Sequence, residues 1–388
     1  MPTDHHAAAA ASSGDRPRRW AFALVCLTYG TATVGEQLLS PLFPTARRDL
    51  GLTTGQGGVA FAVLAVSIAV FNMVAGLALR RWCAATVMRV SLLTVAAGST
   101  VAALATGLPS LLVSQALLGA AAGLFFPSGL QGVATFAEPG RRGFAMGIYG
   151  VAFSVGLTVA ALLGTLGAAT SWRIPFWSGA GLGVVSLVAI ARLRTPMPDP
   201  GGARGVPWRA VFGLPTVVGT IGAMLQYGVL AFFTTFAVER WELTEGAAAA
   251  VLAVGRVVSI AAKLVGGRTT DRVGPRGSVV RTSLLLSALG LLWVLLPGGL
   301  VTYGVAAVFA GTVSSIFPAA NVMAVERFGS HGLALGAYRS VQIGMGALAG
   351  FVIGNSPLSL QITVLIAVST PLLLVWACRP LVASDAQR

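Results

Sequence analysis

The chain has 388 residues, of which 55 % are hydrophobic and 10 % are charged, and its mean hydropathy is +0.82. Soluble globular domains carry roughly 25 % charged residues, so this composition excludes a soluble fold and predicts an all-α polytopic membrane protein. The formal net charge of +14 falls mostly in short loops, where it indicates orientation in the membrane, and we expect no nucleic-acid partner.

Residues 1–19 form a polar, Ala/Ser-rich stretch with arginines at its end, which we interpret as a retained cytoplasmic tail. A signal peptide is disfavoured because the apolar run that follows is long and no small-residue cleavage site ends it. Twelve apolar segments come next, each near the ~20 residues that cross a bilayer. Their expected limits are 20–44, 56–79, 86–106, 109–135, 144–168, 173–193, 210–237, 246–266, 278–297, 300–325, 333–354 and 358–378.

The arginines are divided unevenly between the two sets of loops. The even-numbered loops and the tails hold Arg80, Arg81, Arg141, Arg142, Arg194, Arg204, Arg209, Arg268, Arg272, Arg276, Arg327 and Arg379. The odd-numbered loops hold Arg47, Arg48, Arg173 and Arg240. Because positively charged loops stay on the cytoplasmic side, we expect a multi-pass protein of the cytoplasmic (plasma) membrane with both termini in the cytoplasm.

The second half of the chain repeats the first at a nearly constant spacing. Phe126-Pro127 returns 191 residues later as Phe317-Pro318. Further matches at spacings of 191 or 189 join Gly76 to Gly267, Arg81 to Arg272, and residues 145–149 to residues 334–338. Such parallel repeats predict two pseudo-symmetric six-helix halves with a cavity between them.

The repeat divides the chain into five parts. They are the N-terminal tail 1–19, a six-helix bundle 20–194, a cytoplasmic linker 195–209 rich in Pro, Gly and Arg, a second six-helix bundle 210–379, and a cytoplasmic C-terminal tail 380–388.

One short stretch, Gly267–Arg276, packs four charges and two glycines between two apolar segments. Charges at that density cannot lie in hydrocarbon, so we expect a tight turn at the water side of the membrane. Gly267 and Gly274 permit close backbone approach and positive φ angles. Asp271 can cap the N-terminus of a neighbouring helix, where the helix dipole favours an anion.

This stretch resembles the Gly-x-x-x-Asp-Arg-x-Gly-x-Arg loop signature of the major facilitator superfamily of secondary transporters. The matching residues are Gly267, Asp271, Arg272, Gly274 and Arg276. The resemblance covers about residues 20–380 and is strongest to bacterial twelve-helix efflux permeases. It implies transport by alternating access, with Asp271 docked on the start of the fifth helix, near residues 142–147, in the outward-open state.

The first-repeat copy of the signature departs from the family pattern. Arg80 stands where the family has Asp, with Arg81 after it, and an arginine cannot cap a helix N-terminus. We expect Arg80 to pair with Glu326 instead. The Arg and Gly-Pro of drug/proton antiporters are also absent, because Gln115 and Leu157 occupy those positions. These departures weaken the inference of an antiport mechanism.

Charged and strongly polar side chains inside the expected segments are functional candidates, because they are costly in a bilayer. Glu36, the only carboxylate well inside a segment, is a candidate for proton coupling; the alternatives are that it only pairs with an arginine or that it lies in the outer vestibule. Arg256 keeps its proton and needs an anionic partner, which favours a cavity position over packing on backbone carbonyls. The other expected cavity residues are Gln37, Gln131, Gln226, Tyr227, Asn321 and Arg339. Lys263 is expected to snorkel to the cytoplasmic face.

These features predict a secondary active transporter for a small organic solute, with proton-coupled export of a drug or metabolite as the first hypothesis. The alternative is an organic-anion (carboxylate) carrier or exchanger that uses Arg256 and Arg339. A sensor built on the same fold stays a further alternative. We expect a monomer, no cofactor and no enzymatic activity, because three scattered cysteines and three histidines give no metal or catalytic spacing.

Overall fold

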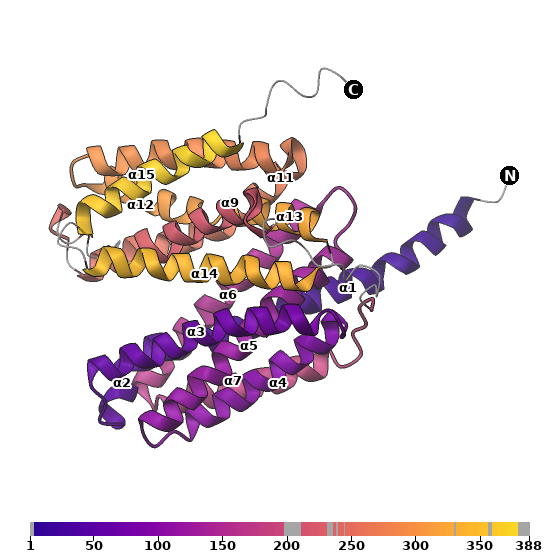
Figure 1. Ribbon diagram of the computed structural model, residues 1–388, viewed down its shortest axis with the longest axis horizontal. Coiled ribbons are helices and arrows are strands. Elements are labelled where there is room, and N and C mark those ends of the chain that lie inside the picture. Colours follow the sequence, from indigo (N-terminus) through magenta and orange to yellow (C-terminus); the bar gives the residue numbers. More distant parts are fainter. Residues whose placement is uncertain are drawn as a thin grey trace. The chain divides into compact units, whose positions relative to one another are not determined.

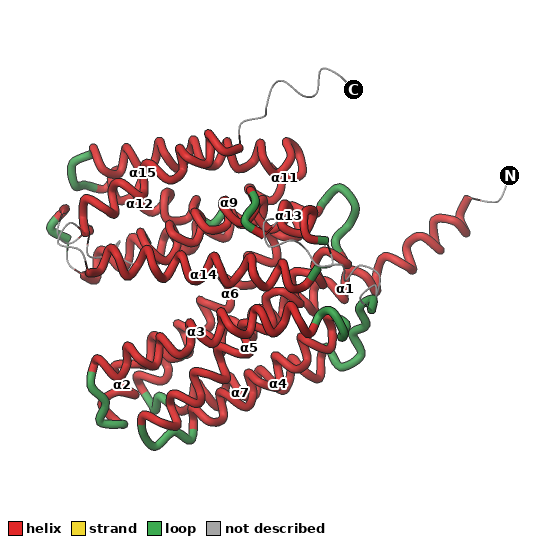
Figure 2. Tube along the Cα trace, in the orientation of Figure 1, coloured by secondary structure: helices red, strands yellow, loops and turns green. Residues whose placement is uncertain are grey.

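The computed structural model describes residues 4–197, 211–230, 236–237, 240–243, 245–329, 331–355 and 359–378, and these ranges contain helices and no strand (Figures 1 and 2). The helices of the first repeat are α1 (Asp4–Gln37), α2 (Leu39–Asp49), α3 (Thr54–Ala78), α4 (Ala84–Ala103), α5 (Leu108–Phe136), α6 (Arg142–Ala169) and α7 (Arg173–Ala189). Those of the second are α9 (Leu214–Ala223), the π-helix η2 (Met224–Val229), α11 (Glu245–Leu295), α12 (Leu300–Val313), α13 (Ile316–Phe328), α14 (Gly332–Asn355) and α15 (Ser359–Cys378).

The expected segments overlap helices wherever their residues are described, but residues 210, 231–235 and 358 lie outside the described residues and two of the segments run together in α11. Six helical stretches there are at least 18 residues long and apolar enough to cross a membrane. The longest of them, 250–293, contains most of the eighth and ninth expected segments, and shorter apolar helices include α7 and the last part of α15. Of the predicted linker 195–209, residues 198–209 lie outside the described residues, as does the whole of the predicted tail 380–388.

The described residues fall into two compact units that differ from the sequence repeats in two places. Unit 1 takes the described residues within Met1–Glu138, Val155–Arg204 and Ser330–Ala337. Unit 2 takes those within Pro139–Ser154, Gly205–Gly329 and Tyr338–Arg388. The start of α6 therefore belongs to unit 2, with most of the second repeat, and the start of α14 belongs to unit 1.

Helix α1 begins at Asp4, so the described part of the predicted tail 1–19 is helical. The run of alanines from residue 7 explains this, since alanine has the highest helix propensity. Arg18 then donates hydrogen bonds to the carbonyl oxygens of Phe136 (3.1 Å) and Ala137 (2.7 Å). A cation at these carbonyls, at the C-terminal end of α5, is favoured by the helix dipole.

The first expected segment is broken at Leu38, where α1 ends and α2 begins. Pro41 has no backbone N–H, so it cannot donate to the carbonyl of Gln37 four residues earlier. Glu36 and Gln37 consequently lie in the last turn of α1, directly before the break.

The charged stretch Gly267–Arg276 is not the tight turn that the sequence predicted. The helix continues through Val273 and is interrupted only at Gly274, which has φ +76°, before Pro275 starts the next helical segment of α11. Pro275 cannot donate to the carbonyl at position 271, and glycine adopts the positive φ without a steric penalty. Gly267 is helical, and its role is close packing.

Each unit has its own core. In unit 1, α5 packs against α1, α3 and α4, and Tyr29 of α1 stacks on Phe125 of α5 with ring centroids 5.7 Å apart. In unit 2, α11 packs against α12, α13 and α15. A cluster of aromatic rings fills this core: Phe236, Trp241, Trp293, Tyr303 and Phe309.

Candidate functional site

The carboxylate of Asp271 caps the start of α6. Its two oxygens accept hydrogen bonds from the backbone N–H groups of Gly143 (2.7 Å) and Phe144 (2.9 Å). The N–H groups of the first helical turn have no partner within the helix, so this bidentate contact satisfies two of them. The contact joins a residue of the second repeat to a helix of the first, within unit 2. The expected docking of Asp271 is present.

Glycines let the two backbones approach closely at this contact. A Cβ on Gly143 would lie 2.5 Å from the carbonyl oxygen of Gly267, and one on Gly267 would lie 2.5 Å from that of Gly143. One turn further along α6, a Cβ on Gly147 would lie 2.6 Å from the carbonyl oxygen of Lys263. We call these five residues, Gly143, Gly147, Lys263, Gly267 and Asp271, the α6–α11 clasp.

Two arginines flank Phe144 beside the clasp. The guanidinium carbons of Arg141 and Arg268 lie 5.3 Å and 5.1 Å from the centre of the Phe144 ring. Such cation–π contacts are worth about 0.5–1 kcal/mol each at exposed sites. Phe144 and Arg268 were not predicted as site residues, although the signature stretch contains the arginine.

A second contact of the same kind lies in unit 1, between α3 and the start of α14. A Cβ on Gly76 would lie 2.5 Å from the Cα of Leu333, and one on Gly336 would lie 2.1 Å from the carbonyl oxygen of Asn72. Gly332 and Gly336 follow Gly143 and Gly147 by 189 residues, so this contact is the repeat of the clasp.

Arg80 occupies the place in this second contact that Asp271 has in the first, four residues after the packed glycine. The side chains of Arg80 and Arg81 are exposed. Arg80 belongs to unit 1 and Glu326 to unit 2, and their pairing stays a prediction. The two contacts thus differ in charge, with an acid at one and a base at the other.

Lys263 is buried, so the expectation that it reaches the cytoplasmic surface is wrong. Its side chain is 5 % exposed. The Nζ atom donates to the carbonyl oxygen of Gly150 (3.0 Å) and to the hydroxyl of Ser154, both on α6. Gly150 makes room for it, because a Cβ there would lie 3.2 Å from the Lys263 Cδ.

Arg256 lies on α11 two turns before Lys263, and its side chain is exposed. Arg339 of α14 is half-buried and donates to the Gln342 Oε1 at 3.1 Å. Gln342 is fully buried, and Asn321 of α13, 7 % exposed, accepts from the Tyr338 hydroxyl at 3.1 Å. The predicted residues Arg339 and Asn321 are therefore joined to two polar residues, Tyr338 and Gln342, that were not predicted as site residues.

Gln226 and Tyr227 lie in the π-helix η2, which follows α9 directly. A π-helix widens one turn of a helix and occurs frequently at functional sites. The Gln226 Oε1 accepts from the Ser314 hydroxyl at 3.5 Å, and the Tyr227 ring packs against Gly346, where a Cβ would lie 2.9 Å from its Cδ2. No sequence signal distinguishes a π-turn from an α-turn here.

Three predicted residues of the first repeat lie in unit 1. Glu36 and Gln37 are half-buried, and the Gln37 amide donates to a Glu36 carboxylate oxygen at 2.8 Å. Gln131 of α5 is half-buried, and its Oε1 is enclosed with no hydrogen-bond partner among the described residues. A buried acceptor of this kind is a candidate for a solute or water contact.

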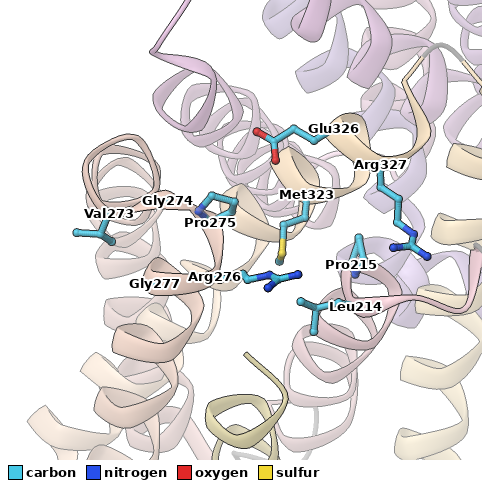
Figure 3. Close-up of a pocket in the computed structure, with 10 residues that line it drawn as sticks. All are labelled: Leu214, Pro215, Val273, Gly274, Pro275, Arg276, Gly277, Met323, Glu326 and Arg327. Carbon is cyan, nitrogen blue, oxygen red and sulfur yellow. The ribbon is translucent and has the colours of Figure 1, made fainter. Parts of the chain in front are cut away.

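A cavity of about 560 Å³ opens beside the kink of α11 (Figure 3). It is lined by Leu214 and Pro215 at the start of α9, by 273–277 of α11, and by Met323, Glu326 and Arg327 of α13. In Figure 3 the Arg276 side chain extends toward Met323. Gly274 and Arg276 of the signature line this cavity, whereas Arg272 is exposed and does not line it.

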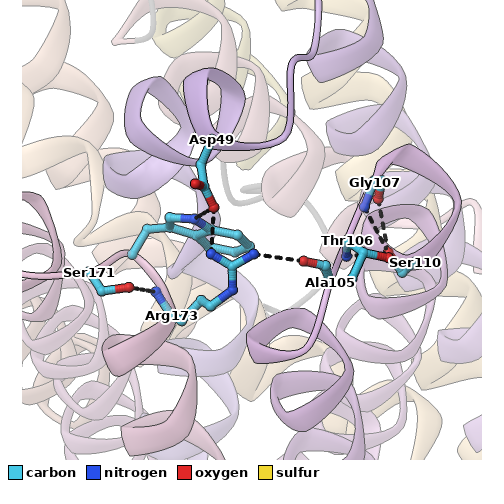
Figure 4. A network of polar contacts seen from close by, with 8 residues as sticks. Asp49, Ala105, Thr106, Gly107, Ser110, Ser171 and Arg173 are labelled. Carbon is cyan, nitrogen blue, oxygen red and sulfur yellow. Dashed lines mark hydrogen bonds and ion pairs between the residues drawn. The ribbon is translucent and has the colours of Figure 1, made fainter.

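A network of polar contacts ties α2 to α7 in unit 1 (Figure 4). Asp49 at the end of α2 accepts from the Trp172 indole N–H (2.9 Å) and pairs with the Arg173 guanidinium, which also donates to the carbonyl oxygen of Ala105 (3.0 Å). The hydrogen bond from Trp172, followed by that from Arg173, lowers the pKa of Asp49 below its ordinary value of 3.8.

The lowered pKa gives this network a pH dependence. Its stabilisation is present above the ordinary carboxyl pKa and is lost as the pH falls through the lower, folded-state value. We expect Asp49→Asn to lower the thermal unfolding midpoint at neutral pH, and the difference from wild type to shrink in acid. Differential scanning fluorimetry across pH checks this, with Arg48→Gln, an exposed change one residue away, as the control. A difference that grows in acid would contradict it.

Together, the apolar helices, the internal repeat and the two glycine-lined contacts define a multi-pass membrane transporter of parallel repeats. The described residues contain no group of three or more His, Cys, Asp or Glu side chains placed to hold a metal ion. The chain belongs to the Major Facilitator Superfamily, whose family model matches residues 25–351.

Known proteins resemble the chain over most of its length. It is 25 % identical over 286 residues to "Uncharacterized MFS-type transporter YceJ" of Bacillus subtilis (strain 168), covering 70 % of this chain and 71 % of that protein. The crystal structure of FucP, an MFS transporter in the outward conformation, matches with a TM-score of 0.79 and 16 % identity over 92 % of this chain and 97 % of FucP. The human organic anion transporter MFSD10 matches with a TM-score of 0.77 and 17 % identity over 93 % and 99 %.

Proposed function

We propose that the chain carries a small organic solute across the membrane by alternating access, with the α6–α11 clasp as its conformational switch. The observation that carries this proposal is the cap that Asp271 of the second repeat places on a helix of the first. A cap of two N–H groups by a carboxylate is an all-or-none contact, because it is lost when the helix start moves by a few ångström. Such contacts give a transporter two discrete states.

The first candidate for the coupled reaction is proton-linked export, with Glu36 as the proton-binding group. Glu36 lies directly before the break between α1 and α2 and is hydrogen-bonded to Gln37. Because Pro41 has no N–H, it cannot donate a hydrogen bond to the carbonyl oxygen of Gln37. We therefore expect a polar pocket beside the Glu36 carboxylate, at the break between the two helices. Export rests on the general resemblance to efflux permeases.

The second candidate is an organic-anion carrier, and the positive charge of unit 2 supports it. Arg256, Lys263 and Arg339 all lie in expected membrane segments, where Glu36 is the only acid well inside a segment. A buried carboxylate of a solute would supply the missing counter-charge. The fold alone does not choose between the candidates, since FucP is named a fucose:proton symporter and MFSD10 an organic anion transporter.

Two substitutions separate these candidates in proteoliposomes with an imposed pH gradient and a panel of anionic, neutral and cationic solutes. Under the first candidate, Glu36→Gln abolishes proton-linked flux and Arg256→Ala is tolerated. Under the second, Arg256→Ala weakens carboxylate binding by about 30-fold or more, because the bound solute would cover the exposed Arg256 and desolvate the charge pair between them. Glu138→Gln and Arg192→Ala, which remove surface charges, serve as matched controls.

The outcomes have distinct meanings. Flux of carboxylates that ignores the pH gradient and survives Glu36→Gln would discard the proton-linked candidate. Unchanged carboxylate binding in Arg256→Ala would discard the anion candidate. Ligand binding with no flux of any solute in the wild type would contradict the transporter proposal itself and favour a sensor.

A further inference from the structure

Lys263 carries a buried amine whose described partners are all uncharged. Its Nζ donates to the Gly150 carbonyl oxygen and the Ser154 hydroxyl, and it lies 5.5 Å from the centre of the Phe153 ring. All three partners belong to α6, the helix that Asp271 caps two turns further along α11. The closed clasp therefore covers Lys263 with groups that accept hydrogen bonds but carry no negative charge.

The charged groups around Lys263 do not supply a counter-ion. On its own helix the nearest are Arg256, Arg268 and Asp271, and the Asp271 carboxylate is already bonded to the start of α6. The facing part of α6 carries Arg142 and the buried Tyr149. The other helices packed on α11 within the described ranges carry, as titratable or charged groups, Tyr303, Glu326, Arg327 and Cys378, and none of these interacts with Lys263.

The described partners leave one N–H of a charged Lys263 amine without an acceptor. An ammonium group has three N–H donors, whereas a neutral amine has two. Lys263 finds two acceptors, Gly150 O and Ser154 Oγ, among the described residues. Burial without a counter-ion also disfavours the charged form of an amine, whereas water favours it.

We propose that Lys263 exchanges a proton as the clasp opens and closes. It holds the proton when α6 has moved away and water reaches the amine, and it releases the proton to that water when α6 covers it. Raising the pH on the side of the membrane where the clasp lies, which we expect to be the cytoplasmic side, therefore favours the closed clasp. This inference rests on the proposed function, because it requires α6 and α11 to separate during transport.

The repeat shows that this property belongs to one contact only. Asn72 is the equivalent of Lys263, 191 residues earlier, and it cannot titrate. Its amide donates to the carbonyl oxygen of Ile68 within its own helix at 2.8 Å. On the other side, Gly150 is matched by Arg339. At the equivalent positions of the second contact, α3 thus carries an asparagine and α14 carries the cation, so only the α6–α11 clasp encloses a lysine.

A cysteine placed at position 270, where α6 covers it, reports whether the clasp is open or closed. This assay does not require the transported solute to be known. Thr270 is 3 % exposed, and its Cβ would lie 2.8 Å from a Cβ on Gly143, so Thr270→Cys is shielded while the clasp is closed. The rate of its alkylation is measured from about pH 6 to about pH 9.5 in full-length protein in lipid nanodiscs. Each rate is divided by that of Met197→Cys, 68 % exposed, which corrects for thiol ionisation. The native cysteines are first replaced by alanine: Cys26, Cys83 and Cys378.

With Lys263 in place, the corrected rate should fall as the pH rises, by up to about tenfold per pH unit, the limit for one proton. Lys263→Met should give a low, pH-independent rate, and Lys263→Arg a high, pH-independent rate. A pH dependence that persists in Lys263→Met would overturn the proposal. So would high rates in Lys263→Met, Lys263→Gln and Lys263→Arg alike, since that result indicates a purely structural lysine.

Asp271→Asn separates failure of this inference from failure of the proposed function. It should raise the corrected rate at every pH by removing the cap while leaving Lys263 unchanged. If Thr270→Cys stays unreactive in Asp271→Asn, the clasp does not open, and the alternating-access proposal fails together with its role for Lys263. If the rate rises in Asp271→Asn but never depends on pH in the parent protein, only the inference about Lys263 is wrong.

Discussion

Replacing Asp271 with asparagine should open the α6–α11 clasp and lower transport turnover at least tenfold. Asparagine keeps one acceptor oxygen but loses the charge and the second acceptor, so one of the two N–H groups of Gly143 and Phe144 loses its partner. Hydrogen bonds to a charged group are worth about 1.5–3 kcal/mol, and the interaction with the helix dipole adds about 0.3–1 kcal/mol. The closed state should therefore lose about 2–4 kcal/mol, which is about 30- to 1,000-fold in its population relative to the open state.

The measurement is flux of an accepted solute in proteoliposomes, beside solute binding to the purified protein. The control is Glu138→Gln, which removes an acid whose ion pair with Arg19 is 3.5 Å long and largely exposed. Surface pairs of this kind contribute about 0–1 kcal/mol, so this variant should transport normally. Normal turnover in Asp271→Asn, at wild-type expression, would show that the cap does not govern the transport cycle.

Among the α14 glycines whose surroundings the structure describes (Gly332, Gly336, Gly344 and Gly346), Gly336 should be the one at which a change to alanine is most damaging. Its Cβ would lie 2.1 Å from the carbonyl oxygen of Asn72, a backbone atom that cannot rotate away. The added methyl group must push α14 off α3 or break the helix locally, and overpacking of this kind typically costs about 1–3 kcal/mol or more. We expect a lower unfolding midpoint and reduced flux.

Gly344 provides a matched control in the same helix. A Cβ there would meet no atom within 4 Å, so Gly344→Ala changes helix propensity without changing packing. Alanine is favoured over glycine in a helix by about 0.5–1 kcal/mol, so this variant should be neutral or slightly more stable. Fluorescence-detected thermal unfolding of both variants checks the pair. Equal midpoints would show that the glycine at 336 is not needed for contact with α3.

The positions of the helices follow from the sequence because apolar runs of bilayer length leave few alternatives. The backbone must satisfy its own hydrogen bonds in hydrocarbon, which makes helices the default for such runs. The repeat and the signature stretch also indicated a helix contact at this place, since Gly267 permits close backbone approach and Asp271 can cap a helix N-terminus. The helix positions needed only local pattern and one internal comparison, whereas the docking of Asp271 on the start of the fifth helix was implied by the resemblance to the family.

Other features depend on neighbours far away in the chain, and periodicity cannot detect them. Lys263 is buried because Gly150, 113 residues earlier, leaves room for its side chain. The stretch after Gly267 stays helical because its N–H groups keep their partners in the preceding turn, so the turn moves to Gly274 before Pro275. The π-helix at Gln226 leaves no composition signal. Of these features, the burial of Lys263 is the one decided by packing against a distant helix.

The way α6 and α14 divide between the two compact units has a consequence for assembly. The first residues of α6 pack on α11 in unit 2, and those of α14 pack on α3 in unit 1, so each repeat completes a surface of the other. A chain cut within 198–209 would yield two fragments, each with a bare glycine-lined groove, and the first would also lose the Asp271 cap on α6. We therefore expect each fragment to fold poorly alone and the two to reassociate through these complementary surfaces when they are made together as a split protein.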